Sequence, residues 1–193
     1  SAKKDMARSG DMTVKFIGKD GDFNFYQGQR FEFADGKVTI DLNGKKINYS
    51  APSPLAIVGK ADITLKNGSL SGLYSVACTT QSDLCSLSVY NVSMPKNGIS
   101  VYGGRLVVYN NSGEVINNMF VSGNGKFEMR GGDILTLVLN GSPEFKISSG
   151  KIGAFRYSDG SKINYSDFLA EGSEFYDIID TDKFAAGEST GFS

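Results

Sequence analysis

Side chains with binding chemistry recur at one position of a short sequence pattern. Lys66, Tyr90, Tyr109 and Arg130 each follow two apolar residues that are separated by a single residue, and Glu128 lies two residues before Arg130. Tyrosine rings can stack on sugar rings, and hydroxyl, ammonium and guanidinium groups bond to sugar hydroxyls or acidic groups. These five residues are therefore the predicted carbohydrate-binding set, provided that their segments lie side by side. The alternative is that stacked tyrosines only stabilise a sheet surface.

Pairs of carboxylates are candidates for catalysis, because glycoside hydrolysis needs two of them about 5–10 Å apart. The candidates are Asp41 with Asp62, and Glu128 with Asp133 or Glu144. Solvated surface charge is the favoured interpretation of all of them. The central segments hold no dense acidic cluster of the kind that binds Ca²⁺. We therefore predict no catalytic residue, no metal site and no cofactor.

Composition narrows the chemistry further. The chain of 193 residues has no histidine, which removes Ser-His-Asp and Cys-His catalysis and the commonest zinc ligand. Its 20 basic and 21 acidic residues give a net charge of −1, so nucleic acid is not an expected partner. No apolar run approaches the roughly 20 residues of a membrane helix, so no membrane insertion is expected. Cys78 and Cys85 bracket a polar loop, and both a disulfide and two free thiols stay open.

The elements that must position these residues are short strands. Runs such as 37–42, 62–66, 86–90, 105–109 and 126–130 alternate apolar and polar residues with a period of two, which is typical of half-buried strands. Asn-Gly pairs at 43–44, 67–68, 97–98, 124–125 and 140–141 indicate tight turns. Such turns are compatible with antiparallel hairpins in a sandwich, or with the corners of a solenoid.

The spacing of the strands favours the solenoid. The first inward apolar residues of successive strands are Ile63, Leu87, Leu106, Phe127 and Phe145, at steps of 24, 19, 21 and 18 residues, and Ile40 lies 23 residues before Ile63. A near-constant step of this length is the signature of stacked coils. We predict an all-β, parallel β-helix over residues 37–165. Residues 1–36 would be an N-terminal extension with a cap or first strand. Residues 166–193 would be a C-terminal cap, with a short amphipathic helix, and a flexible tail.

Stacked coils would align the outward residues in two columns about 4.8 Å apart per step. One column is Thr64, Ser88, Val107, Glu128 and Lys146, and the other is Lys66, Tyr90, Tyr109, Arg130 and Ser148.

These segments resemble a known superfamily. The run KVTIDLNGKKI at 37–47 resembles the opening coil of pectate-lyase-like right-handed parallel β-helices, and Asn67, Asn91 and Asn110 resemble their asparagine ladder. In such a ladder, the amides of successive coils bond to each other and to turn backbone. The resemblance covers residues 37–160, and the ladder breaks at Gly131. It implies a right-handed coil; members include polysaccharide lyases and hydrolases, bacterial adhesins and phage tailspikes.

The leading hypothesis from the sequence is a module of a phage tail or secreted bacterial surface protein that binds a polysaccharide or surface glycan. Such a module would be extracellular, on a cell surface or on a virion. A polysaccharide-degrading enzyme of the same fold is the second hypothesis. The third is a structural spacer or assembly module without a ligand, for which a homotrimer is an open alternative.

Overall fold

The computed structural model describes residues 10–23, 31–49, 55–57, 60–72, 76–78, 86–111, 113–141, 143–161 and 176–177. Within these ranges every regular element is a strand. The strands are β1 (Met12–Lys15), β2 (Gly21–Phe23), β3 (Phe31–Phe33), β4 (Lys37–Tyr49), β5 (Leu55–Ile57), β6 (Asp62–Gly72), β7 (Val76–Cys78), β8 (Ser86–Val101), β9 (Arg105–Val108), β10 (Val115–Ser122), β11 (Lys126–Asn140), β12 (Glu144–Tyr157) and β13 (Tyr176–Asp177).

All of these strands pair in parallel, and the pairs form three ladders. The first ladder joins β1, β4, β6, β8, β9, β11 and β12. The second joins β2, β4, β6, β8, β10, β11, β12 and β13. The third joins β3, β5, β7, β8, β10, β11 and β12. Long strands such as β8 bend at corners and so serve more than one ladder.

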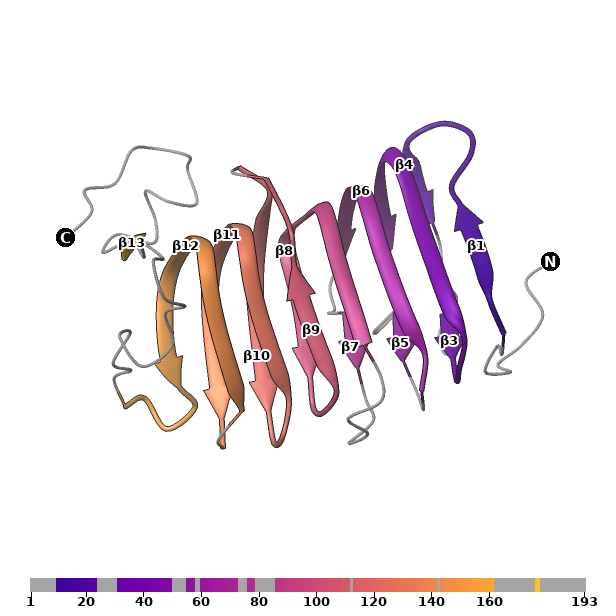
Figure 1. Ribbon diagram of the computed structural model, residues 1–193. Helices are drawn as coiled ribbons and strands as arrows, with labels where there is room; N and C mark the ends of the chain where they lie inside the picture. Colours follow the sequence, from indigo (N-terminus) through magenta and orange to yellow (C-terminus); the bar gives the residue numbers. More distant parts are fainter. Residues whose placement is uncertain are drawn as a thin grey trace.

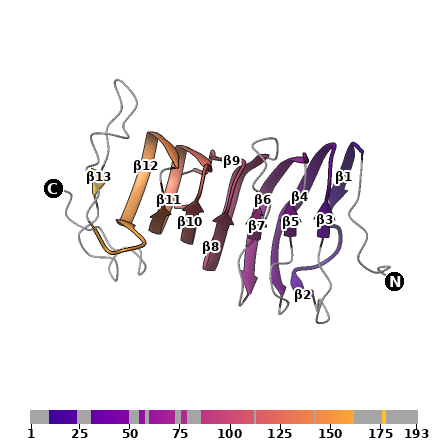
Figure 2. The same cartoon turned by 90° about the horizontal axis from the view of Figure 1, so that it is seen from below.

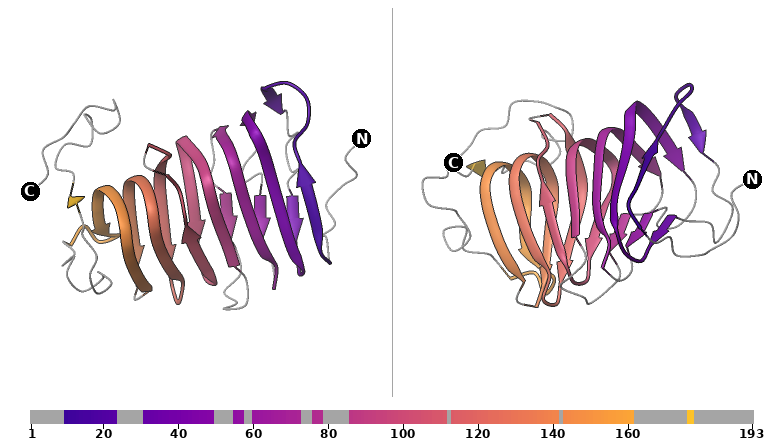
Figure 3. Two further views of the ribbon diagram at one scale, coloured as in Figure 1. Left: turned by 45° about the horizontal axis from the view of Figure 1, so that its top comes forward. Right: turned by 45° about the vertical axis from the view of Figure 1, so that its right-hand side comes forward.

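This arrangement is the parallel β-solenoid that the repeat predicts, and the hairpin alternative is wrong. The strands of the first ladder lie side by side in chain order along one axis (Figure 1). The strands β3, β5 and β7 make a separate row beside β4 and β6 (Figures 1 and 2). Oblique views show the coils following one another from β1 to β12 (Figure 3).

The register of the central coils is the predicted one. Leu87 pairs with Ile63 on one side and with Leu106 on the other, and Phe127 pairs with Leu106 and Phe145. The first step was wrong by two residues, because Val38 and not Ile40 pairs with Ile63.

That error comes from the corner of β4. Asp41 pairs with Lys66 and Lys45 with Gly68, so this corner contains two more residues than the same corner of β6. A template with a constant distance between the strand and the Asn-Gly turn therefore misplaces the pairing of β4 with β6 by two residues.

The core fills the interior of the coils with the inward residues of all three ladders. Alternation within each strand turns every second side chain inward, and stacking then brings the apolar ones together. Fully buried members include Phe33, Leu42, Ile47, Ile63, Leu65, Leu87, Met94, Ile99, Leu106, Ile116 and Met119.

Asparagines shape the corner between the first and second ladders. Asn43, Asn67 and Asn91 have positive φ angles of 55°, 60° and 53°, a conformation that asparagine tolerates better than most residues. Asn43 donates to the Phe16 carbonyl of the preceding coil, whereas Asn67 donates to the Asp41 carboxylate. Asn43 and Asn67 therefore tie their coils to the one before, through backbone or carboxylate rather than through a neighbouring asparagine amide. Among the described residues the buried side-chain oxygen of Asn91 has no hydrogen-bond partner.

Asn110 takes a different role. It is buried, and its amide donates to the Val92 carbonyl and accepts from the Val92 N–H. Its side chain thus reproduces a backbone pairing where β9 has ended.

Strands continue the ladders into both predicted end segments. β1 and β2 pair with β4, and β3 pairs with β5, so the coils begin before the boundary predicted at residue 37. In the predicted C-terminal cap, Tyr176 and Asp177 form a strand beside β12 where a helix was expected. The rest of residues 166–193 lies outside the described residues. No helix in the described part of the chain is long and apolar enough to cross a membrane.

The cysteines fall largely outside the described part of the chain. Cys78 ends β7, but its side chain and Cys85 lie outside the described residues. Both alternatives for the two thiols therefore stay predictions.

Candidate functional site

The predicted carbohydrate-binding residues come together on the outer face of the first ladder. Val89 pairs with Val108, and the next residues, Tyr90 and Tyr109, stack with ring centroids 4.4 Å apart and planes within 2°. The Arg130 guanidinium lies 5.0 Å from the centre of the Tyr109 ring. Tyr90, Tyr109 and Arg130 therefore form a continuous row across three neighbouring coils. We call this row, together with Lys66 and Glu128, the strip.

The stacking decides what the strip can offer to a ligand. Tyr90 and Tyr109 cover each other's inner faces, and Arg130 adds a cation over the Tyr109 ring. A sugar ring therefore cannot stack between the two tyrosines. Ring edges and hydroxyl groups are available instead, and Tyr90 is 36% exposed. Partial burial, followed by the neighbouring Tyr109, raises the pKa of Tyr90, so its hydroxyl is protonated at neutral pH and can donate.

Glu128 holds the cationic end of the strip in place. Its carboxylate accepts from Arg130 Nε at 2.6 Å and from an Arg105 terminal nitrogen at 3.0 Å, and its side chain is only 13% exposed. The Arg130 hydrogen bond, more than any other contact, lowers the pKa of Glu128. Two guanidinium groups on neighbouring coils are thus fixed by one ionised carboxylate.

Arg105 was missed by the sequence prediction. It lies two residues before Val107 and pairs in the ladder with Ser86 and Lys126. A third outward column, two residues before the column that begins at Thr64, would have included Arg105, because outward positions recur at every second residue of a strand.

Lys66 marks the other end of the strip. It pairs with Tyr90 in the ladder, and its ammonium lies 3.8 Å from the Asp41 carboxylate. Asp41 also accepts from the Asn43 backbone N–H, the main reason for its lowered pKa. Part of the Lys66 charge is therefore balanced within the protein.

In the column that contains Tyr90 and Tyr109, the last predicted member, Ser148, was wrong. Arg130 pairs with Ser149 rather than with Ser148, because the register between β11 and β12 shifts after Met129. The first column, Thr64 to Lys146, pairs as predicted along its whole length. Its Val107 is buried although it lies on the outer face, between Ser88 and Glu128.

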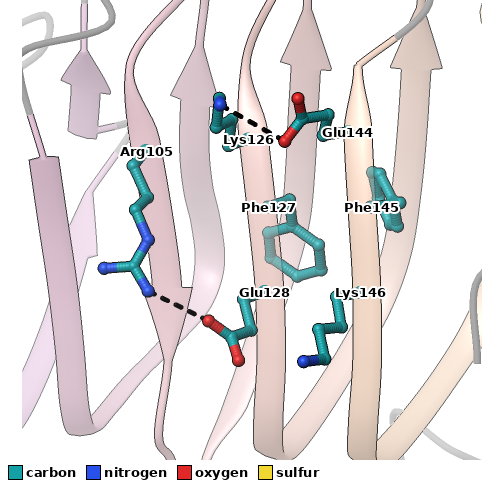
Figure 4. Close-up of a pocket in the computed structure, with 7 residues that line it drawn as sticks. All are labelled: Arg105, Lys126, Phe127, Glu128, Glu144, Phe145 and Lys146. Atoms are coloured by element: carbon teal, nitrogen blue, oxygen red, sulfur yellow. Dashed lines mark hydrogen bonds and ion pairs between the residues drawn. The ribbon is translucent and has the colours of Figure 1, made fainter. Parts of the chain in front are cut away.

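Beside the strip lies a hollow of about 360 Å³ between β9, β11 and β12 (Figure 4). Two ion pairs join neighbouring strands across it: Arg105 with Glu128, and Lys126 with Glu144 at 3.3 Å. Lys146 and the apolar Phe127 and Phe145 complete its lining.

The carboxylate pairs do not form a glycosidase centre. Asp41 pairs with Lys66 and Asp62 with Lys37, so the two acids are four strand residues apart, about 13 Å. Asp133 is buried and accepts from the Gly113 N–H.

Glu128 and Glu144 line one hollow, but neither has the surroundings of a general acid. A general acid needs a raised pKa, whereas the pKa of Glu128 is lowered. Glu144 is 73% exposed and forms an ion pair with Lys126, whereas a carboxyl that serves as general acid lies in an apolar pocket.

The described part of the chain contains no group of three or more His, Cys, Asp or Glu residues arranged to hold a metal ion.

Comparisons with protein-family models, with curated proteins and with solved structures found no match.

Proposed function

We propose that this protein is a glycan-binding or adhesion module whose binding surface is the strip. The observation that carries the proposal is the fixed row of Tyr90, Tyr109 and Arg130 on three adjacent coils. Side chains that are already ordered lose little conformational entropy when they bind. Tyrosine and arginine are also the residue types that most often dominate binding energies.

The glycan lies over the edges of the rings. Hydroxyl groups of Tyr90 and Tyr109 and the terminal amino groups of Arg130 bond to sugar hydroxyls or acidic groups, and the ring edges supply apolar contact. Binding is preferred over hydrolysis because Glu128 is ionised and serves to position two arginines.

The same proposal includes the superfamily to which the protein belongs. A parallel solenoid with asparagine corners supports membership of the pectate-lyase-like right-handed β-helices, in a phage tail fibre, tailspike or bacterial adhesin. The module then acts outside a cell, on a cell surface or on a virion.

A glycan array read with purified protein tests the proposal. The wild-type chain is compared with the double variant Tyr90→Ala/Tyr109→Ala and with Tyr102→Ala, a control tyrosine that is 46% exposed and packs against Phe120 away from the strip. We expect the double variant to lose at least about tenfold in affinity, the worth of a pair of binding tyrosines, and the control to keep it.

Binding that survives the double substitution would reject the strip as the site. Release of reducing ends from a bound polysaccharide would favour the enzyme. Absence of any glycan binding, with a trimer in sedimentation, would favour the spacer.

A further inference from the structure

A second hollow lies at the corner that follows Arg130. It measures about 370 Å³ and is formed by the loop after β9 and by the corners of β11 and β12. Its polar side chains are those of Asn110, Asn111, Arg130, Asp133, Ser149 and Lys151. Arg130 belongs to the strip as well, so this hollow continues the proposed binding surface around the corner of the solenoid.

Glycines give the hollow its form. Between the pairs Arg130–Ser149 and Asp133–Lys151, β11 has Gly131 and Gly132 where β12 has only Gly150. Gly132 has φ of 90°, and a Cβ atom there would lie 2.5 Å from the Asn110 Cβ. The corner can therefore approach the Asn110 loop closely only because it has no side chain.

Arg130 enters the hollow with its orientation already fixed. Nε is bonded to Glu128, and the guanidinium plane is held over Tyr109. Among the described residues the two terminal nitrogens of Arg130 have no hydrogen-bond partner, and the side chain is 43% exposed. A guanidinium held at one edge presents its other edge to a planar or tetrahedral oxyanion.

The charges around the hollow favour an anion. Lys151 contributes a second cation from the far side of the corner. Among the described residues that line the hollow, the only acid is Asp133, which is 7% exposed and accepts a hydrogen bond from the Gly113 N–H.

The outer face of the first ladder adds to this field. Its cations outnumber its carboxylates although the whole chain has a net charge of −1. The cations are Lys15, Lys37, Lys66, Arg105, Lys126, Arg130 and Lys146, and the acids are Asp41, Asp62, Glu128 and Glu144.

We propose that the corner between Arg130 and Lys151 binds the acidic group of the glycan, a carboxylate or a sulfate ester. This inference rests on the proposed function and narrows its ligand to acidic polysaccharides. The strip holds the sugar chain, and the corner selects for the negative charge.

Matched polymers test the charge selection. The probes are polygalacturonate with its carboxyl-reduced form, and dextran sulfate with dextran, titrated calorimetrically at fixed ionic strength because exposed charges are screened by salt. We expect the wild-type chain to bind at least one charged polymer at least about tenfold more tightly than its neutral partner, the worth of one charge-assisted hydrogen bond. The preferred pair distinguishes carboxylate from sulfate.

Lys151→Glu is the decisive variant, because Lys151 lies outside the strip. It should abolish the preference for the charged polymer. Lys46→Glu, at the corner of β4 and away from this hollow, is the control for a general change of charge and should keep the preference. Circular dichroism and thermal melting check that each variant is folded.

The outcomes separate the two proposals. Equal binding of charged and neutral polymers overturns the corner and leaves the glycan-binding function standing. A preference that survives Lys151→Glu, or that Lys46→Glu abolishes equally, also overturns the corner. Failure to bind any of these polymers overturns the inference, while the glycan array decides the function separately.

Discussion

At the scale of single residues, alternation predicted which side chains face outward but not what they touch. Tyr90, Tyr109 and Arg130 were placed in one row because each follows two inward residues at a constant offset. That Tyr90 and Tyr109 stack face to face, and so cannot take a sugar ring between them, depends on rotamers that no spacing reports. The bond from Arg130 to Glu128 is a contact within one strand, two residues apart, and was equally hidden.

Glu128 gives a prediction for stability against pH. Its pKa is lowered in the folded state, so it stabilises the fold above its unfolded pKa of about 4.3, and this contribution is lost as pH falls through the folded pKa. Glu128→Gln should therefore reduce the free energy of unfolding by about 1–3 kcal/mol at pH 7, because it weakens two charge-assisted hydrogen bonds. The difference from wild type should shrink below pH 4. Urea unfolding at pH 7 and pH 3 measures it.

The control is Glu144→Gln, whose exposed ion pair with Lys126 should contribute less than about 1 kcal/mol. A difference between Glu128→Gln and wild type that is the same at both pH values would contradict the role given to this carboxylate.

At the scale of the elements, the strands were predictable and the corners were not. The Asn-Gly pair at 43–44 does mark a corner, with positive φ at both residues. The pair at 97–98, in contrast, lies within β8, where the three residues between Met94 and Gly98 face a single residue of β10, Asn117. This bulge contains Pro95, which cannot donate a ladder hydrogen bond. The identical dipeptide therefore serves two geometries, and only pairing with a neighbouring coil decides between them.

Gly98 and Gly44 provide the corresponding test. A Cβ atom on Gly98 would lie 1.5 Å from the Asn118 carbonyl oxygen, whereas nothing lies within 4 Å of a Cβ atom on Gly44. Gly98→Ala should therefore lower the free energy of unfolding by more than about 3 kcal/mol, since backbone must move. Gly44→Ala should lower it by only about 1–2 kcal/mol, the strain of a positive φ angle. Similar losses in both variants, measured by urea unfolding, would contradict the close approach of β8 and β10.

At the scale of the whole molecule, the spacing of 24, 19, 21 and 18 residues between strands predicted the fold. A near-constant step places Leu87, Leu106 and Phe127 one above the other only if every coil runs in the same direction. The first coil was not recognised, because the step from Met12 to Val38 is longer than those that follow. A coil can lengthen between its paired strands without disturbing a stacked core.

The stacking of coils is the claim on which the strip and the corner depend, and spin-label distances test it most directly. Thr13, Thr39 and Thr64 precede Lys146 in one column of the first ladder, and labels at each would be paired with a label at Lys146. The labels need cysteines, so Cys78 and Cys85 are first replaced by serine.

A spacing of about 4.8 Å per coil predicts backbone separations near 29, 24 and 19 Å for the three pairs. Double electron–electron resonance should therefore report distances that fall by about 5 Å at each step. Distances that do not shorten in this order would contradict the stacking of the coils, and with it the row of Tyr90, Tyr109 and Arg130.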